Sequence, residues 1–341
     1  MIDTSLEAVA TQAEWIPHAF DAEGSRLTSL FVPRDRHSSQ PFLWDLKHNF
    51  HEATHLASEL RAHLPPNNGG TPHFIFHTAF CCSTLLVRAC ATARGAIGLN
   101  EPAILTHLAH RVGVEGNFAN RARLDLVLSL LGRSFDPAGS VIVKPTNFAN
   151  ALIEPILGMR PQAKAVLLYS DLKTMLYSLA RRGALGRVWG RQLYDAYARF
   201  SRLDFGYSAA ESFLQTDLQI AGLGWLMEVH HLEQVARAHP DRTLMLQADD
   251  LLADPRTILE RVYRFLDLDH QPDSIARVVD GPIFSSHSKD PRVHYNRRLR
   301  EQERERVLAT HAEEIRMVAG WIDAIARHVG IRTEASEPAF A

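Results

Sequence analysis

The chain has 341 residues, of which 46% are hydrophobic and 22% are charged, a composition typical of soluble globular proteins. A chain of this length buries about three quarters of the surface of its unfolded state. This excludes a peptide-sized or disulfide-stapled scaffold and allows one large α/β domain or two small ones. The formal net charge of −2 argues against bulk electrostatic binding to nucleic acid.

Membrane and export signals are absent from the sequence pattern. No apolar run approaches the roughly 18 residues of a membrane span, and the first 15 residues contain neither a basic leader nor an apolar core. The cysteines, Cys81, Cys82 and Cys90, form an odd and clustered set rather than a disulfide framework. We therefore expect a cytoplasmic protein without a membrane span.

The N-terminal part begins with two short apolar segments in residues 13–35, around a turn at 21–24. A helix-like stretch follows at 42–63, and the PPNNGG run at 65–70 is the clearest break in the sequence. We expect residues 1–70 to form an N-terminal extension that packs on a main domain.

The main domain is expected over residues 71–331, followed by a flexible tail at 332–341. A short buried strand at 72–77 runs into a helix that begins near Ser83. Further strand-like segments lie at 96–100, 140–144, 164–170 and 243–247, and long helical stretches lie at 208–238 and 298–329. The alternation of strands and helices favours a parallel sheet with right-handed crossovers, covered by helical layers.

Residues 74–86 run from a strand through small residues and hydroxyls into a helix. In that geometry the backbone N–H groups of the turn and of the first helical turn converge, and the helix dipole adds partial positive charge. The segment is suited to hold an anion, and it equally fits an ordinary strand-to-helix turn capped by Ser83. It is not a Walker A loop, because the G-x-x-x-x-G-K-[ST] pattern with its lysine is missing.

Taken together, four segments resemble the sulfotransferases that use 3′-phosphoadenosine 5′-phosphosulfate. They are the strand and loop at 74–86 and the segments at 141–147, 167–183 and 246–269. The last segment is the most specific, because it follows a family pattern of an acidic-Leu pair, an Asp-Pro pair and a Phe-Leu pair. The matching positions are Asp250, Leu251, Asp254, Pro255, Phe265 and Leu266.

The resemblance covers roughly residues 72–330. It implies a three-layer α/β/α fold with a central parallel sheet of P-loop NTPase type and a helix-rich C-terminal part. It also implies an enzyme that transfers a sulfuryl group from this donor to a hydroxyl or amine of a small-molecule, glycan or peptide acceptor. Such transfer depends on in-line positioning and on stabilising charge at the leaving phosphate, so no metal is required in principle.

By resemblance, the loop after the first strand would hold the 5′-phosphosulfate of the donor. Its residues are Thr78, Ala79, Phe80, Cys81, Cys82, Ser83 and Thr84. Phe80 stands where the family usually has Lys or Arg, and Cys82 stands where it usually has Gly. Loss of the loop cation removes a charge-assisted contact to the bridging oxygen. Lys144 ends a strand, as the family lysine does. Either Lys144 replaces the missing loop cation, or the activity is weakened. The alternative is that Lys144 is an ordinary surface lysine at a strand end.

The 3′-phosphate site also departs from the family. Ser170 stands where the family has an arginine, whose bidentate contact is therefore absent, and Ser178 keeps the expected eight-residue spacing. Replacement cations are available at 181–182. The family places a basic loop where this chain has Ser288 and Lys289, which would either clamp the nucleotide or lie in a solvated loop.

A base is needed for the proton of the acceptor, and the residues at 145–147 after Lys144 include no histidine. Glu101 follows the second strand of the main domain, and adjacent parallel strands open onto one crevice at their carboxyl ends. A Glu followed by Pro at this point resembles the catalytic glutamate of bacterial and heparan-type sulfotransferases. The alternative role of Glu101 is to cap the helix that starts at Pro102.

His51, Glu52 and His55 form a literal H-E-x-x-H motif, which zinc peptidases carry on a helix. A third ligand is missing, because the position of the downstream histidine in the metzincin pattern is Arg61. A chain with 18 histidines produces such a match by chance.

Two cysteine patterns also suggest chemistry. Cys82 and Arg88 have the C-x5-R spacing of cysteine phosphatases, but the stretch between them is predicted to be helical and has no glycine to turn amides toward a phosphate. Cys81 and Cys82 at a helix start are candidates for reactive thiols, with packing as the alternative.

Three functions remain open on the sequence. The first is the sulfotransferase. The second is a nucleotide-binding module of the same fold that has lost catalysis, as Phe80, Cys82 and Ser170 suggest, and the third is a zinc hydrolase using His51, Glu52 and His55. The acceptor and the oligomeric state are not predicted, since acceptor specificity in such enzymes lies in variable loops.

Overall fold

The computed structural model describes residues 2–37, 42–43, 50–65, 70–111, 117–201, 203–287, 290–294 and 297–331. The predicted tail at 332–341 and the predicted nucleotide-binding residues Ser288 and Lys289 lie outside these ranges.

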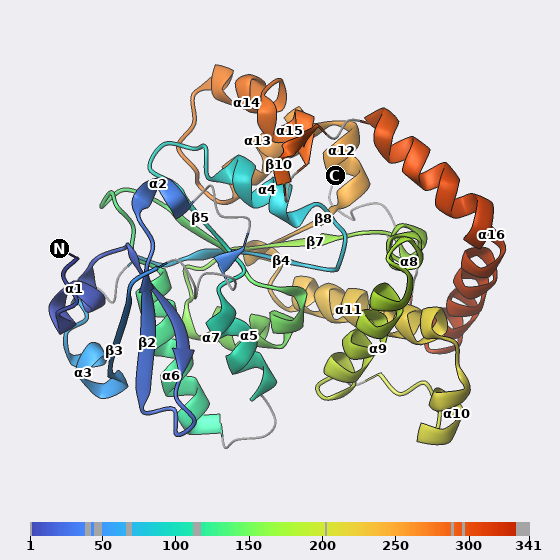
Figure 1. The fold of residues 1–341 in the computed structure, drawn as a ribbon, viewed down its shortest axis with the longest axis horizontal. Helices are drawn as coiled ribbons and strands as arrows, with labels where there is room; N and C mark the ends of the chain where they lie inside the picture. The colour runs from blue at the N-terminus through green and yellow to red at the C-terminus, as the bar shows by residue number, and fades with distance from the viewer. Residues whose placement is uncertain are drawn as a thin grey trace.

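The N-terminal part forms a small antiparallel sheet with short helices around it (Figure 1). Its elements are α1 (Leu6–Thr11), β1 (Trp15–Phe20), β2 (Arg26–Phe31), α2 (Arg34–His37), β3 (Glu52–Leu56) and α3 (Ala57–Ala62). The turn between β1 and β2 is closed by the carboxylate of Asp21, which accepts hydrogen bonds from the backbone N–H groups of Ser25 and Arg26. Such local bonding is what Asp contributes to tight turns.

The helix predicted over 42–63 is wrong where it covers residues 52–56. These residues pair with β2, with Glu52 opposite Leu30 and Leu56 opposite Arg26. Of the described residues in that stretch, 57–62 are helical. The strand forms because β2 offers an edge to pair with, and this non-local contact outweighs the local helical tendency.

The main domain is built on a five-stranded parallel sheet with strand order β5-β6-β4-β7-β8. The strands are β4 (His73–His77), β5 (Ile97–Asn100), β6 (Val141–Lys144), β7 (Ala165–Tyr169) and β8 (Thr243–Gln247). All five were expected as continuous apolar runs, which is typical of parallel strands buried on both faces. Phe74 and Phe76 of β4 belong to one core and Ile75 belongs to the other, as the two-residue period of a strand requires.

Helices cover both faces of this sheet, so the predicted three-layer α/β/α fold is confirmed (Figure 1). One face carries α4 (Ser83–Cys90), α12 (Ala248–Ala253), α13 (Pro255–Phe265), α14 (Pro272–Val279) and α15 (Pro282–Ser285). The opposite face carries α5 (Ala103–His110), α6 (Asn117–Leu131), η2 (Asn147–Leu152), α7 (Ile153–Met159), α8 (Leu172–Arg181) and α11 (Asp217–Ala238).

Further elements pack outside these layers. They are α9 (Gly183–Ala198) against α11, α10 (Ala209–Leu214), η3 (Pro240–Arg242), the ribbon of β9 (Ser286–His287) and β10 (Asp290–His294), and α16 (Arg297–His328) against α8 and α11. The helix predicted over 208–238 is two helices, because Ser208 and Thr216 each begin a new helix with a capping box. None of the described helices combines the length and the apolar character needed to cross a membrane.

Candidate active site

The loop between β4 and α4 has an unusual backbone. Phe80 and Cys82 have φ values of 59° and 63°, in the left-handed region that glycine enters without a steric penalty. This explains why a glycine is expected at the position of Cys82. Helix α4 begins at Ser83, and its N-cap is Cys82 rather than the predicted Ser83. No side chain caps this helix end, whose first N–H groups lack intrahelical acceptors, as in any helix.

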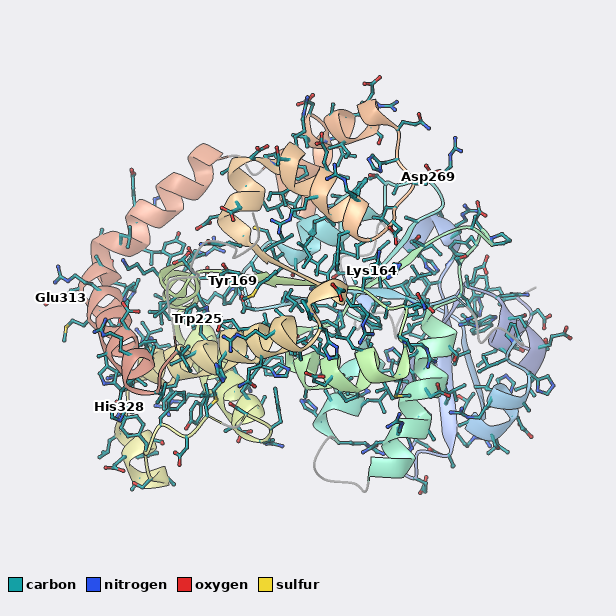
Figure 2. The ribbon with its side chains drawn as sticks, turned by 180° about the vertical axis from the view of Figure 1, so that it is seen from behind. Lys164, Tyr169, Trp225, Asp269, Glu313 and His328 are labelled. Carbon is teal, nitrogen blue, oxygen red and sulfur yellow. The ribbon has the colours of Figure 1, made fainter. Side chains whose placement is uncertain are left out.

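Two predicted ligand residues, Thr78 and Ser170, anchor this loop to the end of β7. Thr78 N–H donates to Leu168 O (2.9 Å), and Thr78 Oγ1 accepts from Ser170 N–H (2.9 Å). The Ser170 hydroxyl donates to Ala79 O (2.9 Å), and Ser170 O accepts from Trp225 Nε1 (2.9 Å). Figure 2 labels Trp225 and Tyr169, the neighbour of Ser170. Both hydroxyls are buried and bonded within the protein, so they hold the loop in place.

The other loop side chains are packed closely. Ser83 and Thr84 are buried at the start of α4, and Cys81 Sγ donates to Thr78 O (3.0 Å). Burial raises the pKa of the Cys81 thiol to about 12. Because the thiolate is the reactive form of cysteine, this environment favours the packing role over that of a redox thiol for Cys81.

Lys144 and Glu101, the two predicted catalytic residues, contact each other. Asn100 is opposite Lys144 in the pairing of β5 with β6, and Glu101 N–H continues the ladder to Lys144 O (2.6 Å). Lys144 Nζ forms an ion pair with Glu101 Oε1. The Lys144 side chain is 1% exposed and that of Glu101 is 16% exposed. Lys144 is therefore not a surface lysine.

Glu101 does not cap the following helix. The N-cap of α5 is Pro102, and no side chain bonds to that helix end. Glu101 has a φ of 54°, a left-handed conformation that is costly for a residue with a side chain. The backbone at this point is held by the sheet ladder to β6 and directs the carboxylate to Lys144.

The loop and this ion pair lie on neighbouring strands. β4 pairs with β6, with Phe74 opposite Val143. Beyond the ladder, His77 Nε2 hydrogen-bonds to Pro145 O (3.0 Å) and joins the end of β4 to the residue after Lys144. The carboxyl ends of three adjacent strands, β5, β6 and β4, thus bring Glu101, Lys144 and the loop to one edge of the sheet.

The predicted 3′-phosphate residues have mixed placements. Ser178 is half-buried on α8, which starts directly after Asp171. Arg182 follows α8, and its guanidinium carbon lies 4.4 Å from the ring centroid of Phe80. Arg182, one of the two candidate cations at 181–182, thus contacts the loop.

A buried polar network below the loop was not predicted. Glu228 of α11 is fully buried, and its Oε1 accepts from Asn147 Nδ2 (2.8 Å) and from the Tyr197 hydroxyl (3.2 Å). Asn150 Nδ2 donates to Tyr197 OH (2.7 Å) and to His77 O (3.1 Å). Within the described residues, Glu228 Oε2 has no hydrogen-bond partner. An acid inside the apolar stretch GLGWLMEV at 222–229 was the signal in the sequence.

The pKa of Glu228 is raised to about 8 by burial, against the opposing effect of hydrogen bonds from Asn147 and Tyr197. Asn150 of the same network donates to His77 O, which lies at the end of β4 directly before the loop. The network therefore supports the start of this loop, while Ser170 bonds to it from β7.

The H-E-x-x-H motif has no such convergence. His51 precedes β3 and His55 lies within it; at about 3.3 Å per residue the two positions are about 13 Å apart, too far to share one ion. His55 Nε2 hydrogen-bonds to Thr4 O (3.0 Å). In the described ranges, no three His, Cys, Asp or Glu side chains are grouped closely enough to hold a metal.

Comparison with known proteins identifies the family. Two solved structures are similar to this chain at low identity. The sulfotransferase domain from the curacin biosynthetic pathway is 14% identical, with 72% of this chain and 99% of that chain covered and a TM-score of 0.43. A sulfotransferase from Mycobacterium avium is 11% identical, with 72% and 76% covered and a TM-score of 0.40. No curated protein matches the chain.

The decisive match is to a family model. The model for the sulfotransferase domain matches residues 144–316, just over half of the chain. The match begins at Lys144 and includes the positions from Asp250 to Leu266, which lie in the most specific of the four segments that carry the resemblance. The chain therefore belongs to the sulfotransferase domain family and is a sulfotransferase.

Proposed function

We propose that this enzyme transfers the sulfuryl group of 3′-phosphoadenosine 5′-phosphosulfate to a hydroxyl or amine of its acceptor, with Lys144 and Glu101 as the catalytic residues. The observation that carries the proposal is their buried ion pair, at the same sheet edge as the β4–α4 loop. Burial of a lysine and a carboxylate is costly, and a buried charge pair at such a sheet edge is a candidate for a functional site.

The residues of the loop fit a phosphate group. Left-handed residues at Phe80 and Cys82 bend the chain where a helix begins, and such bends turn successive N–H groups toward one side. The start of α4 adds the partial positive charge of its dipole. In this proposal Ala79, Phe80, Cys81 and Cys82 contribute backbone, and Ser83 and Thr84 contribute N–H and hydroxyl groups.

Lys144 and Glu101 divide the reaction between them. The bond between sulfur and the bridging phosphate oxygen breaks while the acceptor oxygen or nitrogen forms a bond to sulfur. Lys144 would stabilise the charge that develops on the leaving phosphate oxygen. Glu101, as a carboxylate, would accept the proton of the acceptor, which requires that Lys144 turn from Glu101 toward the phosphate. Thr78 and Ser170 would act by anchoring the loop.

The experiment is a ligand screen by thermal unfolding, followed by turnover. We expect 3′-phosphoadenosine 5′-phosphate to stabilise the enzyme more than ADP or ATP does. At a hundredfold excess over Kd the gain is about 2.7 kcal/mol in unfolding free energy. The proposed contacts of the 3′-phosphate are Ser178 and, outside the described ranges, Ser288 and Lys289. Equal stabilisation by ATP would contradict such a 3′-phosphate site.

Turnover is then measured as release of 3′-phosphoadenosine 5′-phosphate with a panel of alcohols, phenols and amines. Binding of the nucleotide without release for any acceptor would favour the alternative of a nucleotide-binding module that has lost catalysis. Release that depends on one acceptor class would identify that class.

A further inference from the structure

We infer that Arg182 provides the cation that the β4–α4 loop lacks, and that Phe80 positions it against the 5′ anionic group of the nucleotide. This inference rests on the proposed function. Residues 78–84 contain no Lys or Arg, although a phosphate in such a loop gains most from a charged donor. Phe80 occupies the sequence position at which the family usually has Lys or Arg. The guanidinium carbon of Arg182 lies 4.4 Å from the centroid of the Phe80 ring.

Phe80 is held firmly enough to act as a support. Its ring packs on Trp189 at a centroid distance of 5.4 Å, and Trp189 in turn packs edge-on against Phe148 at 5.7 Å. Trp189 comes from α9 and Phe148 from η2, four residues after Lys144. The three rings therefore connect the loop, the end of β6 and α9.

The backbone of Arg182 is also fixed. Arg182 is the C-cap of α8, where its N–H donates to Leu179 O (3.0 Å), and α9 begins at the next residue. That residue, Gly183, has a φ of 56°, which allows the sharp change of direction between the two helices. The Arg182 side chain thus reaches Phe80 from a tight turn between α8 and α9 rather than from a long loop.

Arg187 and Arg191 of the neighbouring α9 each have a counter-ion among the described residues, and Arg182 has none there. Arg187 pairs with Glu314 (3.1 Å) and Arg191 pairs with Asp217 (2.5 Å). Throughout the described ranges, Arg182 has no carboxylate within ion-pair distance, and its neighbour is another cation, Arg181. Partial burial and the charge of Arg181 lower the pKa of Arg182. An anionic ligand would relieve this unbalanced charge.

The ring contact leaves the guanidinium able to bind. A cation over an aromatic face is attracted by the ring quadrupole, and this attraction uses the charge rather than the N–H donors. The five N–H groups of arginine form a planar fork that matches phosphate and sulfonate oxygens. Since Phe80 is in the loop, the fork is placed at the 5′ end of the nucleotide and not at the 3′-phosphate.

Three probes of nucleotide binding test this assignment by titration calorimetry. They are 3′-phosphoadenosine 5′-phosphate, adenosine 3′-phosphate and adenosine 5′-phosphate. We expect Arg182→Ala to weaken the bisphosphate by about 10- to 100-fold, the range for loss of a charged hydrogen bond, and to leave adenosine 3′-phosphate within about twofold. Arg199→Ala, which removes an exposed arginine at the C-terminal end of α9, is the control and should change neither.

Relocation of the charge tests the role of Phe80. Phe80→Leu keeps an apolar side chain but removes the ring face, so it should weaken the bisphosphate in the same direction as Arg182→Ala. In the Arg182→Ala background, Phe80→Lys places a cation in the loop itself and should restore most of the lost affinity. Thermal unfolding of each variant without nucleotide confirms that it is folded.

Unchanged bisphosphate affinity in Arg182→Ala would overturn the inference, and so would a selective loss of adenosine 3′-phosphate binding, which would assign Arg182 to the 3′ end. Failure of the parent enzyme to bind the bisphosphate would instead overturn the proposed function. Titration of the parent enzyme with the bisphosphate therefore distinguishes failure of the inference from failure of the proposed function.

Discussion

The N-terminal antiparallel sheet and the main parallel sheet each carry a pair of side chains that could perform chemistry. On the first, His51 and His55 are close in sequence, exposed or half-buried, and about 13 Å apart along an extended chain. On the second, Glu101 and Lys144 are 43 positions apart and form a buried ion pair. Closeness in sequence is thus a poor guide to a site. Residues at the carboxyl ends of neighbouring parallel strands, in contrast, lie at the same edge of the sheet however far apart they are in sequence.

The largest expected effect is on Glu101. Glu101→Gln keeps the shape and hydrogen-bonding capacity of the side chain but removes the proton acceptor, so kcat should fall about 10²- to 10⁴-fold. Affinity for 3′-phosphoadenosine 5′-phosphate should hardly change. Glu59→Gln, an exposed glutamate of α3, is the control. Turnover near the parental rate in Glu101→Gln would leave the base unidentified.

The next effect is expected at Lys144. Lys144→Met removes the buried charge at similar volume and should lower kcat about 10²- to 10³-fold, since a donor to the leaving oxygen is lost. A double-mutant cycle with Glu101→Gln, followed by chemical unfolding, should give a coupling energy of roughly 0.5–3 kcal/mol. Additive effects on unfolding would mean that the ion pair contributes nothing and would break the contrast with the histidine pair.

Glu228 should make stability depend on pH. Its pKa is about 8 in the folded enzyme, against an ordinary value of 4.5. Between these values the folded state keeps a proton that the unfolded state has lost, so the free energy of unfolding falls as pH rises. The slope reaches at most about 1.4 kcal/mol per pH unit.

The side chain in Glu228→Gln cannot ionise, so this variant should lose the part of the pH dependence of the unfolding free energy that Glu228 causes. The exposed Glu313 of α16 (Figure 2) provides the control Glu313→Gln, in which the slope should persist. The measurement is the free energy of unfolding by urea from pH 5 to 8. An unchanged slope in Glu228→Gln would show that Glu228 is already ionised in the folded enzyme.

The smallest effect is expected at the histidines. His51→Ala and His55→Ala should leave kcat within about twofold, and loss of the bond from His55 to Thr4 should cost at most about 1 kcal/mol of stability. Their effects on unfolding should add within about 0.5 kcal/mol. Stoichiometric zinc after dialysis, lost together with activity in either variant, would reverse this view.

Much of the main sheet follows from local sequence, because buried parallel strands appear as short apolar runs. The choice of Glu101 and Lys144 rests on their positions at strand ends together with the resemblance to sulfotransferases, and their catalytic roles stay predictions. β3 does not follow from local sequence, because its partner β2 ends 21 residues earlier and no local pattern contains that contact. The contact of Arg182 with Phe80 depends on the direction of α8, which the apolar pattern leaves undetermined. Glu228 is visible in the sequence as an acid among apolar residues, but its partners Asn147 and Tyr197 are not.

The parallel sheet also determines where this protein can be modified without harm. Each strand enters from the edge opposite Lys144, so the connection at 132–140 is about one strand length, roughly 15 Å, from that residue. Its tip at 136–138 is exposed, and exposed loop tips accept inserted sequence well. An affinity tag or a surface-coupling peptide inserted there would attach the enzyme to a support with the sheet edge that carries Lys144 directed toward the solution.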